Sequence, residues 1–231
     1  SDEQREEDTK LLPYLASDSF NHQRADSRYP LVLTYVRRPE YYAVFNQGQA
    51  RVGRQRFGLG LIWHQSAGAL LQSQSESNTT AWGTKAANSP TVYEASIPAA
   101  DYQVNGTRWT PRYGAYNLPN GDVQISYFLG SQGRKAVVFS DTGIQIDIEH
   151  AGAFTEHIPL LVAAGDDLTV NASRAVLTRG NVSLVLEASD GVEVKWTPTS
   201  ERVGRYTVYL LTIAAEGKLS YGLQVVSEDV R

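Results

Sequence analysis

The feature that most constrains the fold is an alternation of apolar and polar residues with a period of two. Residues 123–127 (VQISY) and 144–148 (IQIDI) place apolar side chains at every second position. Successive side chains of a strand point to opposite faces, so this pattern is typical of antiparallel strands with one packed and one solvated face. No segment between the later runs is long enough for a crossover helix, which argues against a parallel sheet.

Short runs of this kind recur to the end of the chain and are separated by turn residues. The candidate strands are residues 31–36, 41–45, 57–62, 69–72, 91–97, 123–129, 136–139, 144–149, 157–162, 174–178, 182–187, 192–196, 206–213 and 220–226. Asp141-Thr142-Gly143 and Ala215-Glu216-Gly217-Lys218 have the composition of tight turns, in which glycine supplies a positive φ. So many short strands predict an all-β fold, a large two-sheet antiparallel β-sandwich.

The N-terminal residues differ from the rest of the chain. Residues 1–18 begin with an acidic run and carry Leu11, Leu12 and Leu15 on one side of a helix, but Pro13 would end or kink that helix. We expect residues 1–18 to form either a short helix or a linker, and residues 19–231 to form the sandwich domain. The chain contains no methionine, so we expect it to be a processed piece of a longer protein.

The composition argues against several classes of function. The formal net charge is −4 and the sequence pI is about 5.6, which argues against a general affinity for nucleic acid or for an anionic membrane. No apolar run approaches the roughly 18 residues that span a bilayer. The chain has no cysteine, which excludes disulfides, thiolate metal sites and a cysteine nucleophile.

The histidines are the first candidates for catalysis. His22, His64 and His150 are weak candidates, because none lies in a recognisable catalytic motif. The pairs Glu149-His150 and Glu156-His157 resemble a metal-ligand cluster, but neighbouring residues of a strand point to opposite faces and the spacing matches no zinc motif. We therefore expect cross-strand polar pairs here, and we expect the domain to hold neither a metal nor a cofactor.

Two segments rich in arginine or aromatic residues are candidates for binding, because guanidinium pairs with planar anions and flat rings stack on apolar sugar faces. Residues 48–60 (GQARVGRQRFGLG) lack the Gly-Lys-Ser/Thr ending of a P-loop and predict a basic hairpin tip. Residues 105–117 predict a loop, and residues 74–88 predict the most polar loop of the chain. The candidate glycan-binding residues are Arg51, Arg54, Arg56, Arg108, Trp109, Arg112 and Tyr113.

Four segments made of apolar and glycine positions carry a resemblance to a known family. They are residues 41–48 (YYAVFNQG), 57–64 (FGLGLIWH), 67–74 (AGALLQSQ) and 154–161 (FTEHIPLL). Together they resemble the C-terminal β-sandwich of heparinase II/III-like polysaccharide lyases, over residues 19–231. The resemblance implies a two-part parent protein, in which an α/α-toroid carries most catalytic residues and the sandwich closes the cleft.

The chain departs from that family in two respects. It has no succession of helical hairpins, so the toroid is not within it. The resemblance also implies a histidine near an arginine-rich strand, but residues 35–39 (YVRRP) contain none, and His22 is the only upstream histidine. We therefore leave the catalytic residues unassigned.

The resemblance implies an accessory module of a secreted or periplasmic bacterial polysaccharide lyase, not catalytic in isolation. Its expected partners are a helical catalytic domain of the same parent protein and an anionic polysaccharide, with no nucleic acid and no membrane. Two alternatives stay open. One is a self-sufficient lyase or hydrolase that uses His64 or His150 beside a tyrosine on the sandwich face, and the other is a purely structural domain without a ligand.

Overall fold

A computed structural model describes residues 19–26, 28–49, 55–74 and 79–228, so the predicted helix or linker at 1–18 lies outside the described residues. The described residues form seventeen strands and one short 3₁₀ helix, η1 (Tyr93–Ala95). The first nine strands are β1 (Phe20–Asp26), β2 (Leu31–Arg37), β3 (Tyr42–Gly48), β4 (Gly58–His64), β5 (Gly68–Gln72), β6 (Gly83–Ala86), β7 (Asp101–Val104), β8 (Thr107–Trp109) and β9 (Gly114–Leu118). The others are β10 (Val123–Leu129), β11 (Gly133–Ser140), β12 (Gly143–Val162), β13 (Asp167–Asn171), β14 (Arg174–Arg179), β15 (Val182–Ala188), β16 (Val194–Val203) and β17 (Tyr206–Ser227). No helix within the described ranges is long and apolar enough to span a bilayer.

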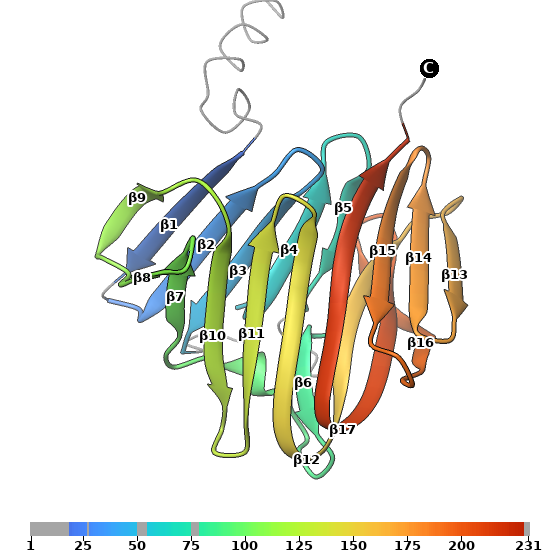
Figure 1. Ribbon diagram of the computed structural model, residues 1–231. Helices are drawn as coiled ribbons and strands as arrows, with labels where there is room; N and C mark the ends of the chain where they lie inside the picture. The colour runs from blue at the N-terminus through green and yellow to red at the C-terminus, as the bar shows by residue number, and fades with distance from the viewer. Residues whose placement is uncertain (1–18, 27, 50–54, 75–78, 229–231) are drawn as a thin grey trace, which may run out of the picture.

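The strands pair antiparallel and lie in two facing layers (Figure 1). The front layer contains β7, β10, β11, β15, β14 and β13, together with the first half of β12 and the second half of β17. The rear layer contains β9, β1, β2, β3, β4, β5 and β16, together with the other halves of β12 and β17. The predicted all-β class and large antiparallel β-sandwich are therefore confirmed.

The two longest strands, β12 and β17, join the layers. β12 pairs from Ile144 to Val162 with Thr207 to Leu223 of β17, and the register shifts once, between His150 and Ala153. Both strands bend at the bottom of the molecule as drawn in Figure 1. A β-bulge bends a strand and increases its twist, so the pair passes from the front layer into the rear layer without a loop.

This continuity corrects the predictions made for β12 and β17. Residues 215–218, predicted as a turn, lie inside β17, where Gly217 adopts a φ of 77° beside the bulge. The predicted strands 144–149 and 157–162 are two halves of β12. Cross-strand polar pairs do form, with Glu149 bound to Lys218 of β17 and Glu156 bound to Thr84 of β6.

Other differences from the predictions arise where polar residues face inward. β1 was not among the predicted strands, because its inward residues Asn21 and Gln23 are polar and fully buried. Residues 91–97 contain η1 instead of the predicted strand, and this helix turns the Glu94 side chain into the core. By contrast, β12 follows its alternation, with Ile146 buried and Asp147 exposed.

The core between the layers contains a buried ion network. The Lys135 ammonium on β11 lies 2.9 Å from Oε1 of Glu94 and 2.6 Å from Oε1 of Glu156, and all three side chains are buried. Its remaining donor reaches Oγ1 of Thr84 at 3.1 Å. Nζ also lies 3.7 Å from the centroid of the Trp82 ring, an attractive cation–π position. The three protons of the ammonium therefore all have acceptors.

Both buried carboxylates are also saturated by donors. Glu94 accepts from the Tyr127 hydroxyl and from the Thr84 amide, and Glu156 accepts from the hydroxyls of Tyr221 and Thr84. Burial raises the pKa of Glu156, and the Lys135 ammonium opposes that shift. Burial, followed by the nearby carboxylates, raises the pKa values of Tyr127 and Tyr221 well above the ordinary value, so both phenols stay protonated and donate.

Replacing Lys135 tests whether this network stabilises the core. We expect Lys135→Met to lower the free energy of unfolding by about 3–5 kcal/mol, because it leaves two buried carboxylates without a counter-charge. Urea unfolding followed by tryptophan fluorescence measures the change. The control is Arg134→Met on the neighbouring, exposed position, which should change stability by less than about 0.5 kcal/mol. An unfolding midpoint of Lys135→Met equal to that of the wild type would contradict the role of the ion network.

Candidate functional site

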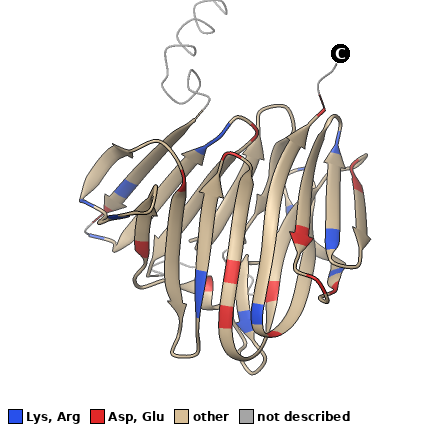
Figure 2. Ribbon diagram, viewed as in Figure 1, with Lys and Arg blue, Asp and Glu red and all other residues tan. Residues whose placement is uncertain are grey.

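The outward faces of the two layers differ in chemistry. On the front layer Arg134, Glu149 and Lys218 are cross-strand neighbours, and Nζ of Lys218 lies 2.9 Å from Oε1 of Glu149. Acidic and basic segments alternate across the lower part of this layer (Figure 2). Opposite charges in this arrangement are typical of a solvated sheet surface. The rear layer instead carries a group of aromatic and basic side chains on its outward face.

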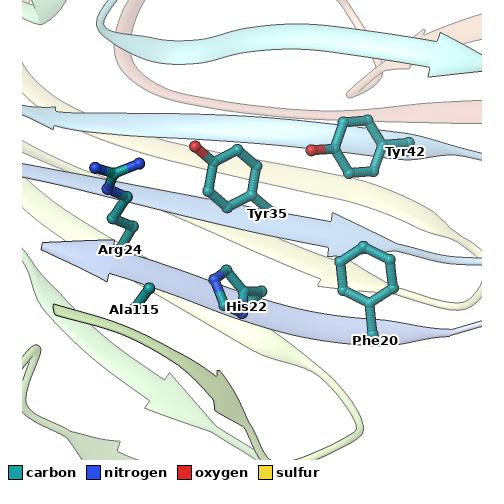
Figure 3. A pocket seen from close by; sticks show the side chains of 6 residues that line it. All are labelled: Phe20, His22, Arg24, Tyr35, Tyr42 and Ala115. Atoms are coloured by element: carbon teal, nitrogen blue, oxygen red, sulfur yellow. The ribbon is translucent and has the colours of Figure 1, made fainter. Parts of the chain in front are cut away.

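Three adjacent strands and β9 build a pocket on this rear outward face. The pocket has a volume of about 390 Å³. Its lining residues are Phe20, His22, Arg24, Tyr35, Tyr42 and Ala115 (Figure 3). The β1 residues lie two positions apart and so share a face, and cross-strand pairing places Tyr35 opposite His22 and Ala115 opposite Arg24. The register of β1, β2, β3 and β9 therefore assembles the pocket from residues far apart in the sequence.

The aromatic rings form a continuous row, in which the tyrosines are near-parallel and Phe20 and His22 are tilted against them. The rings of Tyr35 and Tyr42 stack with centroids 6.4 Å apart and planes 18° apart. Phe20 lies 6.3 Å from Tyr42, and the His22 ring lies 6.0 Å from Tyr35. In Figure 3 the side chains of Tyr35, Tyr42 and Phe20 line the same side of the sheet. Such rings offer stacking area for a flat, partly apolar ligand.

Polar groups border these rings. Nδ1 of His22 lies 3.0 Å from Oδ1 of Asn117, and an amide oxygen accepts, so this hydrogen bond places a proton on Nδ1. Arg24 is exposed at one end of the pocket. Arg37 lies between Phe20 and Tyr42 in the cross-strand register. The site thus combines stacking surface with two guanidinium groups and an oriented imidazole.

The buried Arg38 side chain holds the strands beneath this face. Its Nη1 donates to Oδ1 of Asn21 at 3.0 Å, and its Nη2 donates to the Gly121 carbonyl at 2.6 Å. Asn21 in turn donates to the carbonyls of Gly121 and Pro119. These bonds connect the end of β2 to β1 and to the segment between β9 and β10. They fix which residues of β1 and β2 face outward.

The other histidines lie away from the pocket and make structural hydrogen bonds. His64 is buried, and its Nδ1 accepts from the Ser66 amide at 3.1 Å. His150 is buried at the bulge, where Nε2 lies 3.0 Å from the Tyr93 hydroxyl and Nδ1 lies 2.8 Å from the Gly152 carbonyl. His150 also lines a pocket, of about 540 Å³, together with Arg134 and Lys218. The lining of the rear pocket, by contrast, combines His22 with both tyrosine and arginine.

The predicted glycan-binding residues are dispersed. Arg51 and Arg54 lie outside the described residues, and Arg56 is exposed in the connection from β3 to β4. Arg112 lies 5.8 Å from the centroid of the Trp109 ring, and that ring packs on Tyr116. Tyr113 is 68% exposed, and Arg108 pairs with Asp101 at 3.4 Å. The described part of the chain brings Trp109 and Arg112 together but places none of these residues in the pocket lining.

Five lining residues and the neighbouring Arg37 were not predicted as site residues: Phe20, Arg24, Tyr35, Tyr42, Ala115 and Arg37. The alternation in residues 20–24 (FNHQR) places Phe20, His22 and Arg24 on one face. This pattern could have predicted that Phe20 and Arg24 lie beside His22, whereas no local pattern indicates the residues of β2, β3 and β9. No cluster of three His, Cys, Asp or Glu side chains suited to a metal occurs among the residues that the structure describes.

Comparisons with known proteins identify the fold. No protein-family model and no curated protein sequence matches this chain. The heparan sulfate lyase HepC from Pedobacter heparinus matches in structure with a TM-score of 0.60 at 8% identity, over 90% of this chain and 37% of that chain. The heparinase III BT4657 gene product matches with a TM-score of 0.60 at 11% identity, over 97% of this chain and 40% of that one. HI1317 matches with a TM-score of 0.52 at 11% identity, over 85% of this chain and 93% of that chain.

These likenesses show the fold. The chain spans less than half the length of the two lyases, and it is similar to a β-sandwich part of them. HI1317 shows that the same architecture also makes up nearly the whole of a solved chain.

Two buried histidines, His64 and His157, are expected to make stability depend on pH. Burial lowers the pKa of His64 below 6.5, opposed by Glu40 and assisted by Arg37. Burial also lowers the pKa of His157, and the charge of Lys85 adds to this effect. As the pH falls below 6.5, the unfolded chain takes up protons that the native chain does not. We therefore expect the free energy of unfolding to fall, by up to about 1.4 kcal/mol per pH unit for each histidine.

The variant His64→Gln/His157→Gln should show a smaller loss of stability between pH 7 and pH 5. Urea unfolding at several pH values measures both slopes, with each protein compared to its own value at neutral pH. A double variant that keeps the wild-type slope would show that these two histidines do not cause it.

Proposed function

We propose that this chain is an accessory β-sandwich module of a polysaccharide lyase-like protein. In this proposal the rear outward face forms one wall of a cleft for an anionic glycan, and a helical catalytic domain of the same parent protein forms the other. The proposal also includes secretion or periplasmic localisation in a bacterium. The observation that carries it is the pocket in which Tyr35 and Tyr42 stack beside His22 and Arg24.

The chemistry of the face suits an anionic sugar polymer. Aromatic rings stack on the apolar C–H faces of pyranose rings, and a row of several rings offers more than one such contact to a sugar chain. Guanidinium groups pair with carboxylates and sulfates through parallel N–H donors. Arg24 and Arg37 border the stacking surface formed by Tyr35 and Tyr42, so one ligand can use both kinds of contact.

The size of the structural neighbours supports a second domain. The chain covers 37% of one lyase and 40% of the other, so a protein built in the same way has a large further part. A ligand cleft between two domains is a common arrangement, because each domain supplies one wall. The rear outward face is the surface that we assign to the partner domain and the glycan.

The alternative of a self-sufficient enzyme is favoured by one observation. HI1317 is covered over 93% of its length, so this architecture does not require a large second domain. In that case His22, oriented by Asn117 and adjacent to Tyr35, is the group placed for proton transfer. The purely structural alternative predicts no ligand at this face.

Glycan binding is the direct test of the proposed site. We expect the chain to bind immobilised heparin and heparan sulfate, and we expect Arg24→Gln to weaken the affinity about tenfold, because a charge-assisted contact is lost. Tyr35→Ala should weaken it through loss of stacking. The matched control is Arg174→Gln, an exposed arginine on the front layer, which should bind like the wild type. Equal retention of Arg24→Gln, Tyr35→Ala and the control would contradict this location of the site.

A lyase assay on this chain alone separates the accessory module from the self-sufficient enzyme. Heparin, heparan sulfate, hyaluronan, chondroitin sulfate and alginate are offered, and the unsaturated uronide is followed by its ultraviolet absorbance. We expect no product from any substrate, because the catalytic groups of the proposed partner domain are missing. Turnover that disappears in His22→Gln would establish the enzyme alternative instead.

A further inference from the structure

Arg37 is the unusual group on the rear outward face. Nη1 of its guanidinium is buried and has no hydrogen-bond partner among the described residues. A buried donor without an acceptor costs free energy, and the cost is larger for a charged group. The adjacent Arg38 has acceptors for both Nη1 and Nη2, and its buried Nε, which makes no hydrogen bond either, is paired with Oδ1 of Asp141 at 3.3 Å. A ligand that supplies an acceptor to this nitrogen would remove that cost.

The position of Arg37 relative to Arg24 constrains that ligand. Arg37 lies opposite Phe20, and Arg24 lies four positions further along β1 on the same face. With a rise of about 3.3 Å per residue, the two arginine positions are separated by roughly 13 Å along the strand direction. His22 and Tyr35 occupy the row between them. A single sugar ring spans less than this separation of the two backbone positions.

We propose that Arg37 and Arg24 form a two-point anion site for an oligosaccharide that lies along β1. One carboxylate or sulfate group binds at Arg37, between Phe20 and Tyr42, and a second one binds at Arg24. The sugar between these groups stacks over Tyr35 and beside His22. This inference rests on the proposed function and adds the ligand's minimum length, its direction across the sheet and the spacing of its charges.

The charge spacing distinguishes this site from general attraction of polyanions. A basic patch binds any dense polyanion and loses affinity uniformly as its charges are removed. A two-point site instead requires two anionic groups on one chain, because each arginine takes one group. A monosaccharide therefore uses one arginine, and a longer oligosaccharide uses both.

Titration calorimetry with two probes tests the two-point site. The probes are glucuronate, with one carboxylate, and a heparan sulfate hexasaccharide. For the hexasaccharide we expect Arg24→Gln and Arg37→Gln each to lower the affinity about tenfold, and the double variant about a hundredfold. Glucuronate should bind far more weakly, and only Arg37→Gln should reduce its binding further. Arg174→Gln is the charge-matched control, and thermal unfolding confirms that each variant is folded.

His64 supplies an independent readout of the anion at Arg37. Burial first, and then the Arg37 guanidinium, lower the pKa of His64, whereas Glu40 raises it. An anion bound at Arg37 compensates the guanidinium charge, so the pKa of His64 should rise when the hexasaccharide saturates the protein. NMR titration of the imidazole resonances measures this shift. In Arg37→Gln the hexasaccharide should leave the His64 pKa unchanged, and His157 is the internal reference.

The outcomes separate this inference from the proposed function. If the wild type binds the hexasaccharide but Arg24→Gln and Arg37→Gln bind equally well, the two-point site is overturned and an anionic glycan site elsewhere remains. The two-point site is also overturned if glucuronate binds as tightly as the hexasaccharide, or if His64 does not respond. If the wild type binds no anionic glycan, both the inference and the proposed function fail.

Discussion

The buried ion network around Lys135 is the interaction on which the rest of the structure depends. It joins Lys135 of β11 to Glu94 of η1 and to Glu156 of β12, and hydroxyls from β10 and β17 complete it. Glu156 follows the bulge at which β12 leaves the front layer. The cation therefore stabilises the bent strand and the segment containing η1 at the same point. Two buried carboxylates would repel each other without it, which would destabilise the closure of the layers at this point.

The passage of β12 and β17 between layers gives the molecule two outward faces with different roles. The inner faces of the two layers pack against each other, so only the outer faces are available to contact a ligand. On the front layer Glu149 and Lys218 compensate each other, and such a surface is stable in water without a ligand. On the rear layer stacked tyrosines adjoin Arg24 and a guanidinium nitrogen of Arg37 that lacks an acceptor. This difference in charge compensation, more than hydrophobicity, is the reason that we propose the rear layer as the binding face.

The sequence predicts those parts of the fold whose inner residues are apolar. The alternation in β10 and in the first half of β12 predicts both the strand and its buried face. It fails for β1 and η1, because Asn21, Gln23 and Glu94 are polar residues that pack inward and are satisfied by distant partners. The site was only partly predictable for a related reason. His22 was a candidate, but its contact with Asn117 joins residues 95 positions apart, and no local pattern reports that register.

The buried polar residues inside the sandwich also determine which side chains form the site on its outer face. Asn21 and His22 are neighbours that point to opposite faces, and so are Arg38 and Arg37. A slip of one residue would exchange every inward and outward side chain. In a strand with only apolar inner residues, packing alone resists such a slip. Here the slip would also break the hydrogen bonds from Arg38 to Asn21 and to the Gly121 carbonyl. Because an unsatisfied buried guanidinium is far more costly than a poorly packed methyl group, the inner hydrogen bonds fix His22, Tyr35 and Arg37 on the outer face of the rear layer.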